Sequence, residues 1–249
     1  MNNIVSLSGG KDSTCMLIKM LEKNEPIHSV VFFDTGWEFP EMYEHITKLQ
    51  AYTGVKIWTL HPRLPFDYWM TTRPTIAKNG PKKGEVHCVG NGWPLISRRW
   101  CTGKKIDTLL YYARPVKNAV QCVGYAADEK TRAFSSTKTK HRFPLQEYGI
   151  TESNALKICK DHGFHWGGLY EHFSRVSCFC CPFQPIRELR KLRREFPKLW
   201  GRMIDMERAI PDGRNKDFNN GKTVYELERR FYQEDQQMSL LDNRSVNKD

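Results

Sequence analysis

Six consecutive residues near the start of the chain combine the groups that proteins use to bind phosphate: Ser8, Gly9, Gly10, Lys11, Asp12 and Ser13. The two glycines allow a positive φ that turns backbone N–H groups toward an anion, and a helix beginning here adds partial positive charge. The run is not a Walker A loop, which needs glycine in place of Val5 and serine or threonine in place of Asp12. By composition it also fits an ordinary strand-to-helix turn. We therefore predict a phosphate-binding loop of a different class.

Two further polar segments follow buried strand patterns in the same way. They contain Asp34, Thr35 and Gly36 in the first case, and Gly124, Asp128, Glu129 and Arg132 in the second. An aspartate in such a position also serves as a helix N-cap or a turn residue. An arginine binds phosphate or sulfate through two parallel hydrogen bonds, although most surface arginines are only solvated. Both segments are candidates for the same anion site.

The elements that must position these residues alternate between strands and helices. Apolar runs predict strands at residues 4–7, 30–33, 55–60 and 119–125, with helical spacing after the first two at 16–21 and about 40–52. Such alternation predicts an α/β fold with a parallel twisted sheet flanked by helices, and ligands beyond the carboxyl ends of the strands. Helical patterns opening at 151 and near 185–210 and 223–236 predict a C-terminal helical extension.

With its six-residue loop placed directly after a first strand, the chain resembles the PP-loop ATP pyrophosphatases, and in particular the PAPS reductase-like branch of that adenine nucleotide alpha hydrolase-like superfamily. Residues 33–41 are similar to the Asp-Thr-Gly-x-x-Phe-Pro-Glu segment of that branch, and residues 124–132 to its Gly-x-x-x-Asp-Glu-x-x-Arg segment. The matching segments span about residues 3–183. The resemblance implies a PP-loop or HUP-like fold whose loop holds the β and γ phosphates of ATP or a phosphosulfate group.

The resemblance also implies roles for individual residues. The implied catalytic groups are Lys11, Asp12, Asp34 and Arg132. The implied contacts to ATP or a sulfonucleotide are Ser8, Gly9, Gly10, Lys11, Asp12, Ser13, Asp34, Thr35, Gly36, Gly124, Asp128 and Glu129. Mg²⁺ normally assists such phosphate chemistry, and Asp12 and Asp34 are its candidate contacts.

Four cysteines are candidate metal ligands. Cys178 and Cys181 form a C-x-x-C pair, which is close enough to chelate one metal centre. The branch resembled here places a further cysteine in a basic segment before a helix, which corresponds to Cys101, and Cys180 is the candidate fourth thiolate. Reductases of the branch that carry a cluster use a Cys-Cys pair where this chain has Trp100 and Cys101. Such thiolates suit an iron–sulfur cluster, which we expect, or zinc, and metal-free buried thiols are the third alternative.

Composition indicates the class of protein. Hydrophobic residues make up 39% of the 249 residues and charged residues 27%, which is typical of a folded globular chain. No stretch approaches the roughly 18 apolar residues of a membrane span, and no signal-peptide pattern opens the chain. We therefore expect a cytoplasmic protein with no membrane partner, in which disulfides are unfavoured and Cys15, Cys122 and Cys159 are small core residues.

We expect residues 1–183 to form a nucleotide-binding domain, with a substrate lid or insertion at about 63–100, and residues 184–249 to form a basic helical extension. The net charge of +11 attracts polyanions. Seven basic residues crowd the extension: Arg187, Arg190, Lys191, Arg193, Arg194, Lys198 and Arg202. A tRNA or DNA is therefore a candidate partner, and a solvated basic face is the alternative.

These features favour an enzyme that binds ATP and adenylylates an acceptor with release of pyrophosphate, as part of sulfur transfer from a donor protein. A sulfonucleotide reductase is the alternative, but the relatives that reduce sulfonucleotides use a cysteine nucleophile in a C-terminal tail, and no cysteine follows Cys181. A non-catalytic nucleotide- or nucleic-acid-binding module is the third class. The sequence points to no particular oligomeric state.

Overall fold

The computed structural model of the protein describes residues 2–129 and 140–246, with side chains up to residue 237. The chain forms two compact units. The first consists of Met1–Phe66 and Cys101–Phe179, and the second of Asp67–Trp100 and Cys180–Asp249. The predicted insertion therefore belongs to the same unit as the C-terminal helices, whereas we expected it to be part of the nucleotide-binding domain.

A parallel sheet of five strands forms the centre of the first unit. The strands in spatial order are β3 (Ile57–Leu60), β2 (Ile27–Phe33), β1 (Asn2–Leu7), β6 (Ala119–Val123) and β7 (Lys140–Arg142). The central strands are rich in β-branched and aromatic side chains, which pack well in a buried sheet. Residues 30–33 of β2 are all buried. The predicted α/β fold with a parallel sheet is confirmed. The edge strand β7 has only three residues, all of them basic, and its sequence gives no strand pattern.

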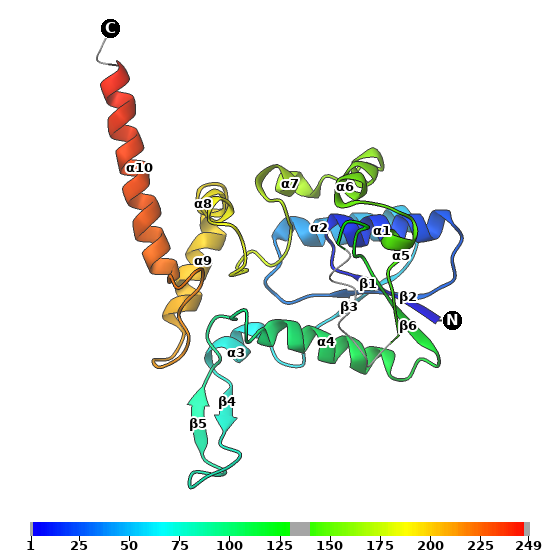
Figure 1. The fold of residues 1–249 in the computed structure, drawn as a ribbon, viewed down its shortest axis with the longest axis horizontal. Helices are drawn as coiled ribbons and strands as arrows, with labels where there is room; N and C mark the ends of the chain where they lie inside the picture. Colours follow the sequence, from blue (N-terminus) through cyan, green and yellow to red (C-terminus); the bar gives the residue numbers. More distant parts are fainter. Residues whose placement is uncertain (1, 130–139, 247–249) are drawn as a thin grey trace. The chain divides into compact units, whose positions relative to one another are not determined.

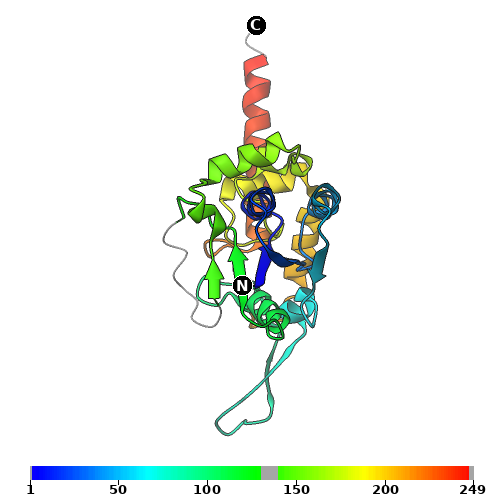
Figure 2. The ribbon, with the colours of Figure 1, turned by 90° about the vertical axis from the view of Figure 1, so that its right-hand side faces the viewer.

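Helices cover both faces of this sheet (Figures 1 and 2). The long helices are α1 (Lys11–Glu22) and α2 (Pro40–Thr53) on one face, and α4 (Trp100–Ala113) on the other. Leu109 of α4 is buried in one cluster with Ile4 of β1 and Val31 of β2. Three shorter helices complete the unit: α5 (Pro144–Glu147), α6 (Glu152–Asp161) and α7 (Leu169–His172).

The strand order reverses at β1, because β2 and β3 lie on one side of it and β6 and β7 on the other. Open α/β sheets bind ligands beyond the carboxyl ends of the strands at such a reversal. Ser6 of β1 is in register with Val123 of β6, so the loops that follow these two strands start side by side. The topology thus brings together two of the polar segments singled out in the sequence.

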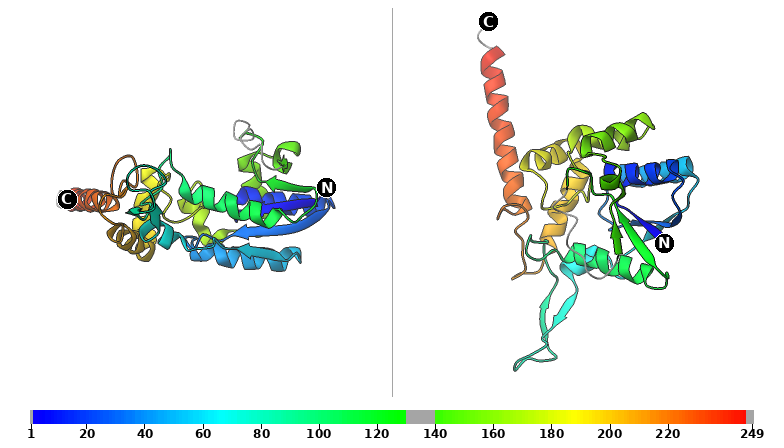
Figure 3. Two further views of the ribbon diagram at one scale, coloured as in Figure 1. Left: turned by 90° about the horizontal axis from the view of Figure 1, so that it is seen from below. Right: turned by 45° about the vertical axis from the view of Figure 1, so that its right-hand side comes forward.

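The second unit contains the segment that we expected to be irregular. After α3 (Phe66–Thr71), β4 (Pro74–Ile76) and β5 (Val86–Val89) form an antiparallel hairpin (Figure 3). Its strands have only three and four residues, which is too short to give a clear alternating pattern. Three helices follow in the C-terminal part: α8 (Ile186–Glu195), α9 (Pro197–Arg208) and α10 (Val224–Val246). No helix in the described ranges, α10 included, is long and apolar enough to cross a membrane.

Candidate functional site

The predicted phosphate loop connects β1 to α1 and leaves backbone donors available. Gly9 has a φ of +80°, and Gly10 is the N-cap of α1 but offers no capping side chain. Within the described residues, no hydrogen bond uses the N–H groups of Gly9 and Gly10. Because these donors lie at the positive end of a helix of 12 residues, the loop can bind an anion.

Two serines close this loop. The N–H of Ser8 donates to Ser13 Oγ at 3.1 Å, and the two hydroxyl oxygens lie 3.0 Å apart. The Ser13 hydroxyl also donates to the carbonyl of Gly10 at 3.0 Å. These bonds fix the two ends of the loop to each other, so the glycines between them are held in one conformation.

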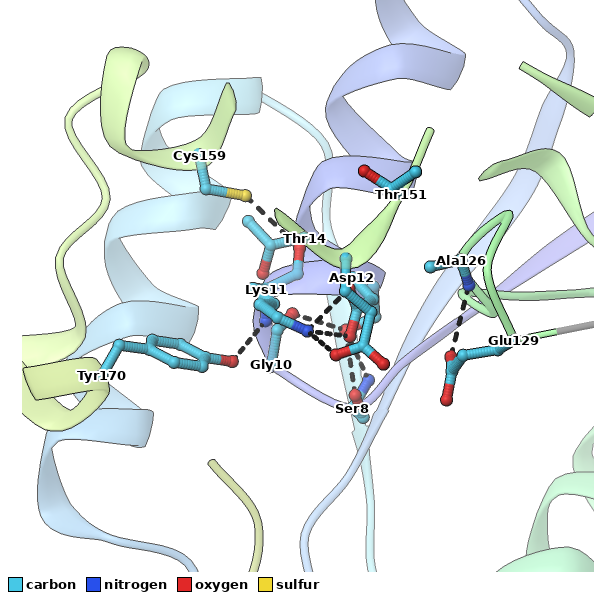
Figure 4. Close-up of polar contacts among 12 residues, drawn as sticks. Ser8, Gly10, Lys11, Asp12, Thr14, Ala126, Glu129, Thr151, Cys159 and Tyr170 are labelled. Atoms are coloured by element: carbon cyan, nitrogen blue, oxygen red, sulfur yellow. Dashed lines mark hydrogen bonds and ion pairs between the residues drawn. The ribbon is translucent and has the colours of Figure 1, made fainter. Parts of the chain in front are cut away.

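Lys11 is only 6% exposed although it carries a charge. Its Nζ lies 2.9 Å from Asp12 Oδ2 (Figure 4) and 2.7 Å from Glu152 Oε2. Burial opposes the charge, but hydrogen bonds to Glu152 and Asp12 outweigh it and raise the pKa of Lys11. Burial raises the pKa of Asp12, and its contact with Lys11 only partly offsets this. The ammonium is therefore held charged by two carboxylates beside the loop.

Three residues from a segment distant in the sequence form hydrogen bonds with the backbone of the loop. The Trp166 indole N–H donates to the carbonyl of Gly9 at 2.7 Å, and the N–H of Lys11 donates to the Tyr170 hydroxyl at 2.7 Å. Cys159 donates to the carbonyl of Lys11 at 3.3 Å, which gives this buried thiol a structural role. We did not predict Trp166 or Tyr170, because about 150 residues separate them from the loop and no sequence spacing relates the two segments.

A cavity of about 580 Å³ lies at the strand reversal within the first unit. It brings together predicted residues from the two loops, namely Ser8, Asp12, Ser13, Gly124 and Glu129. It also adds charged and aromatic residues that we did not assign to a site: Lys105, Glu152, Arg175, Tyr125, His141 and Phe143. The Tyr125 and Phe143 rings stack with centroids 5.5 Å apart. The cavity thus has polar groups at the loop and flat apolar rings beside β6 and β7.

Gly124 allows the two loops to approach each other. A Cβ atom at this position would lie 2.9 Å from the backbone N and Cα atoms of Ser13. That distance is shorter than packing permits, and backbone atoms of a helix do not move aside easily. The glycine in the second polar segment is therefore required by the close packing of β6 against the start of α1.

The other residues of the second segment have different positions. Glu129 lines the cavity and accepts a hydrogen bond from the N–H of Ala126 at 3.3 Å. Asp128 accepts from the N–H of Glu152 at 3.1 Å, at the first turn of α6, which is a capping contact. Arg132, a predicted catalytic residue, lies outside the described residues.

Asp34, Thr35 and Gly36 form a second cluster, at the end of β2. Asp34 Oδ1 accepts from the N–H of Gly36 at 2.7 Å and from the Tyr43 hydroxyl at 2.9 Å, which is a turn and helix-start role. Thr35 Oγ1 donates to Glu38 Oε1 at 2.8 Å, and burial raises the pKa of Glu38. None of the three is among the described residues that line the cavity.

The candidate metal ligands divide between the two units. Cys101 and Cys178 belong to the first, and Cys180 and Cys181 to the second. Cys178 Sγ lies 3.4 Å from Thr35 Oγ1. Among the side chains that the structure describes, those of residues 2–129 and 140–237, no three His, Cys, Asp or Glu groups gather as a metal site. The soft donor set suits iron–sulfur or zinc chemistry, but its assembly stays a prediction. Cys15, Cys122 and Cys159 are buried, as expected for core residues.

The basic residues of α8 are partly neutralised by acidic residues of α10. Arg193 Nε lies 2.8 Å from Glu228 Oε2, and Arg193 also pairs with Asp235. Arg190 pairs with Glu234. The expected polyanion-binding face of this helix therefore loses its central charges to an internal helix contact.

A comparison with known protein families supports the predicted phosphate loop and the segment at the end of the next strand, β2. Residues 2–79 match the phosphoadenosine phosphosulfate reductase domain. The resemblance to the PAPS reductase family is thereby confirmed for residues 2–79, which carry the loop and the β2 segment. The four candidate metal ligands and the residues around Gly124 lie beyond this match.

Two uncharacterized proteins of Methanocaldococcus jannaschii are similar over most of the chain. MJ0066 is 27% identical over 235 residues, which are 85% of this chain and 42% of MJ0066. MJ0973 is 23% identical over 219 residues, which are 81% of this chain and 46% of MJ0973. The chain thus spans less than half the length of these relatives.

Among solved structures, the chain is similar to a U34-tRNA thiolase, NcsA from Methanococcus maripaludis, with its 4Fe-4S cluster. The TM-score is 0.41 at 15% sequence identity, covering 84% of this chain and 72% of that chain.

Proposed function

We propose that the protein is a PP-loop enzyme that binds ATP in the 580 Å³ cavity, adenylylates an acceptor and takes part in sulfur transfer. The observation that carries the proposal is the meeting of the phosphate loop and the Gly124 loop at one cavity, at the point where the strand order reverses. The domain match over residues 2–79 supports it, because it covers the whole loop.

In the proposed reaction, an acceptor atom attacks the α-phosphorus of ATP and loses its proton. The bond between the α-phosphorus and the bridging oxygen breaks, and pyrophosphate leaves. The N–H groups of Gly9 and Gly10 would bind the departing phosphates, since preorganised donors stabilise charge that develops on them. Lys11 would add a cation once phosphate competes with Asp12 and Glu152 for its ammonium.

Mg²⁺ is the proposed cofactor of this step. Asp12, Glu129 and Glu152 line the cavity, so a polyphosphate meets three carboxylates there. A divalent cation held by Asp12 would neutralise phosphate charge and offset this repulsion. Asp34, the other expected contact, belongs to the separate cluster at the end of β2, so we assign the cation to Asp12.

Calorimetric titration with ATP tests the proposal. We expect the double variant Lys11→Ala, Asp12→Ala to bind ATP at least about tenfold more weakly, because a charge-assisted contact to phosphate contributes about 1.5–3 kcal/mol. The matched control removes an exposed ion pair from the other end of the same helix, in the double variant Lys19→Ala, Glu22→Ala. Unchanged affinity in the loop variant would remove the phosphate-loop assignment.

A pyrophosphate-release assay with candidate acceptors tests turnover. Release of pyrophosphate only when an acceptor is present is the expected result. Binding of a sulfonucleotide with thiol-dependent sulfite release, and no pyrophosphate, would establish the reductase alternative. Nucleotide binding with neither product would leave the non-catalytic module.

For the sulfur-transfer part we propose an iron–sulfur cluster on Cys101, Cys178, Cys181 and Cys180, with zinc as the alternative metal. The proposed partners are a sulfur donor protein and a tRNA or DNA acceptor, and the proposed location is the cytoplasm. The net charge of +11 supports a polyanionic partner.

A further inference from the structure

The hairpin of the second unit carries lysines that form no ion pair in the described part of the chain. Lys78, Lys82 and Lys83 lie at its tip and are exposed. No ion pair between residues of the described ranges includes any of the three. Glu85 is the one carboxylate in residues 74–89, so the hairpin is cationic. By contrast, the central arginines of α8 are paired with α10.

The tip that carries these lysines has a defined conformation. The N–H of Ala77 donates to the carbonyl of Glu85 and the N–H of Gly84 to the carbonyl of Ala77, both at 2.9 Å. The N–H of Lys83 donates to the carbonyl of Gly80 at 3.1 Å. A ligand that binds here pays little to order the backbone, because the turn is already closed.

The base of the hairpin is anchored within its own unit. The N–H of Gly90 donates to the carbonyl of Arg73 at 2.9 Å, which closes the ribbon. Beyond it, Trp93 is 1% exposed, and its N–H donates to the carbonyl of Asn215 at 3.0 Å. The ring of Trp93 packs edge-on against Phe218. The two strands therefore project from a fixed base (Figure 3).

Both strands also expose aliphatic side chains. Ile76 on β4 is 46% exposed and Val86, its partner in the register, is 59% exposed. Aliphatic groups at the surface of a ribbon can contact the methyl groups of thymine, while lysines beside them bind phosphate. This combination favours a nucleic acid over a small anion.

We infer that the hairpin binds B-form DNA, with the ribbon in the major groove and Lys78, Lys82 and Lys83 on the phosphates. The major groove of B-DNA, about 12 Å wide, admits a two-stranded ribbon, whereas that of A-form RNA is too narrow. The inference selects DNA as the nucleic-acid partner in the proposed function. The reason why the protein would bind DNA rests on that proposed function. The contact itself requires no ATP, so binding measured without nucleotide separates the two ideas.

Fluorescence anisotropy with duplex DNA over a salt series, without ATP, tests the inference. We expect the logarithm of the binding constant to fall linearly with that of the salt concentration. In the triple variant Lys78→Gln, Lys82→Gln, Lys83→Gln the slope should become shallower by up to about 3, since each phosphate contact contributes about 0.9. Replacement of the same three lysines by arginine should preserve the slope.

The control variant makes the same charge change on exposed lysines of the first unit: Lys117→Gln, Lys157→Gln and Lys160→Gln. It should keep the wild-type slope. The hairpin is not the contact if the slope becomes shallower by the same amount in both glutamine variants, or if it does not change in the hairpin variant. Absence of binding at low salt, or tighter binding to duplex RNA than to duplex DNA, would also overturn the inference. Loss of DNA binding with intact ATP binding would leave the proposed function in place.

Discussion

Gly124 is the residue at which the smallest change should have the largest effect on the cavity. A methyl group there would lie 2.9 Å from the backbone of Ser13, so β6 and the start of α1 would have to separate. We expect Gly124→Ala to lower the free energy of unfolding by about 1–3 kcal/mol, as overpacking does. ATP affinity should fall with it, because the phosphate loop would shift. Urea unfolding and calorimetry measure the two effects.

Gly201→Ala is the matched control for this substitution. Gly201 lies in α9, and a Cβ there would meet nothing within 4 Å. Because alanine favours helix by about 1 kcal/mol over glycine, this variant should be as stable as the wild type or more so. Equal ATP affinity in the two variants would mean that Gly124 does not position the loop.

Site residues that are contiguous in the sequence were predictable, and those that come from distant segments were not. The phosphate loop could be predicted because all its chemistry lies within Ser8–Ser13. Tyr170 binds the same loop through a single hydrogen bond from a helix far along the chain, and no sequence pattern marks that contact. Asp128 shows a different difficulty, since it caps α6 and its sequence context is equally compatible with ligand binding.

The packing of α2 against α1 contains a buried histidine that should make stability depend on pH. His45 is 4% exposed, its Nε2 lies 2.9 Å from Thr14 Oγ1, and its ring stacks on Trp166. Burial, with a smaller effect from Lys48, lowers the pKa of His45 to about 4. The neutral ring therefore stabilises the fold above the unfolded pKa of about 6.5, and this contribution is lost as the pH falls toward 4.

We expect the free energy of unfolding to decrease between pH 6.5 and 4 by at most about 3 kcal/mol on account of His45. In His45→Gln this part of the pH dependence should vanish, and in the control His28→Gln, at an exposed site on β2, it should remain. Chemical unfolding at several pH values measures it. A wild-type decrease that persists in His45→Gln would assign the effect to other groups.

Among the elements, those with a long apolar pattern were predictable. The strands β1, β2, β3 and β6 and the helix α2 lie within a few residues of their expected ranges, because burial imposes the pattern. Strand β7 and the hairpin have three or four residues in each strand, and short exposed strands need no alternation. The basic helix α8 was predicted as a helix, but its charge pairing depends on α10 and could not be read from α8 alone.

For the whole molecule, the cysteines give the most direct chemical test. Protein purified without oxygen should be brown, absorb in the visible range and lose iron in Cys101→Ser, Cys178→Ser or Cys181→Ser, because thiolates are the ligands of iron–sulfur clusters. Cys88→Ser, at a half-buried cysteine of the hairpin, is the control and should retain iron. Metal analysis and absorption spectra measure the outcome.

Cys180→Ser distinguishes two versions of this centre. Loss of iron would make Cys180 the fourth ligand, and retention would leave one iron open to another ligand. Stoichiometric zinc without iron would refute the cluster and weaken the sulfur-transfer proposal, while the ATP site would be unaffected. The sequence could nominate Cys178 and Cys181 by their spacing and Cys101 by the family resemblance, but the four candidate thiols lie on segments that belong to different units.

The first unit is built from two separate stretches of the chain. This division also sets the order in which its strands can pair during synthesis. β1 is complete after residue 7, yet its neighbour β6 begins only at residue 119, after the whole 67–100 segment has been made. Until then one edge of β1 is without its strand, and closing so long a loop is entropically slow. A ribosome that pauses within residues 67–118 would therefore hold a β1–β2–β3 fragment whose β1 edge has unpaired backbone N–H and C=O groups, which is the stage at which this protein should depend most on chaperones.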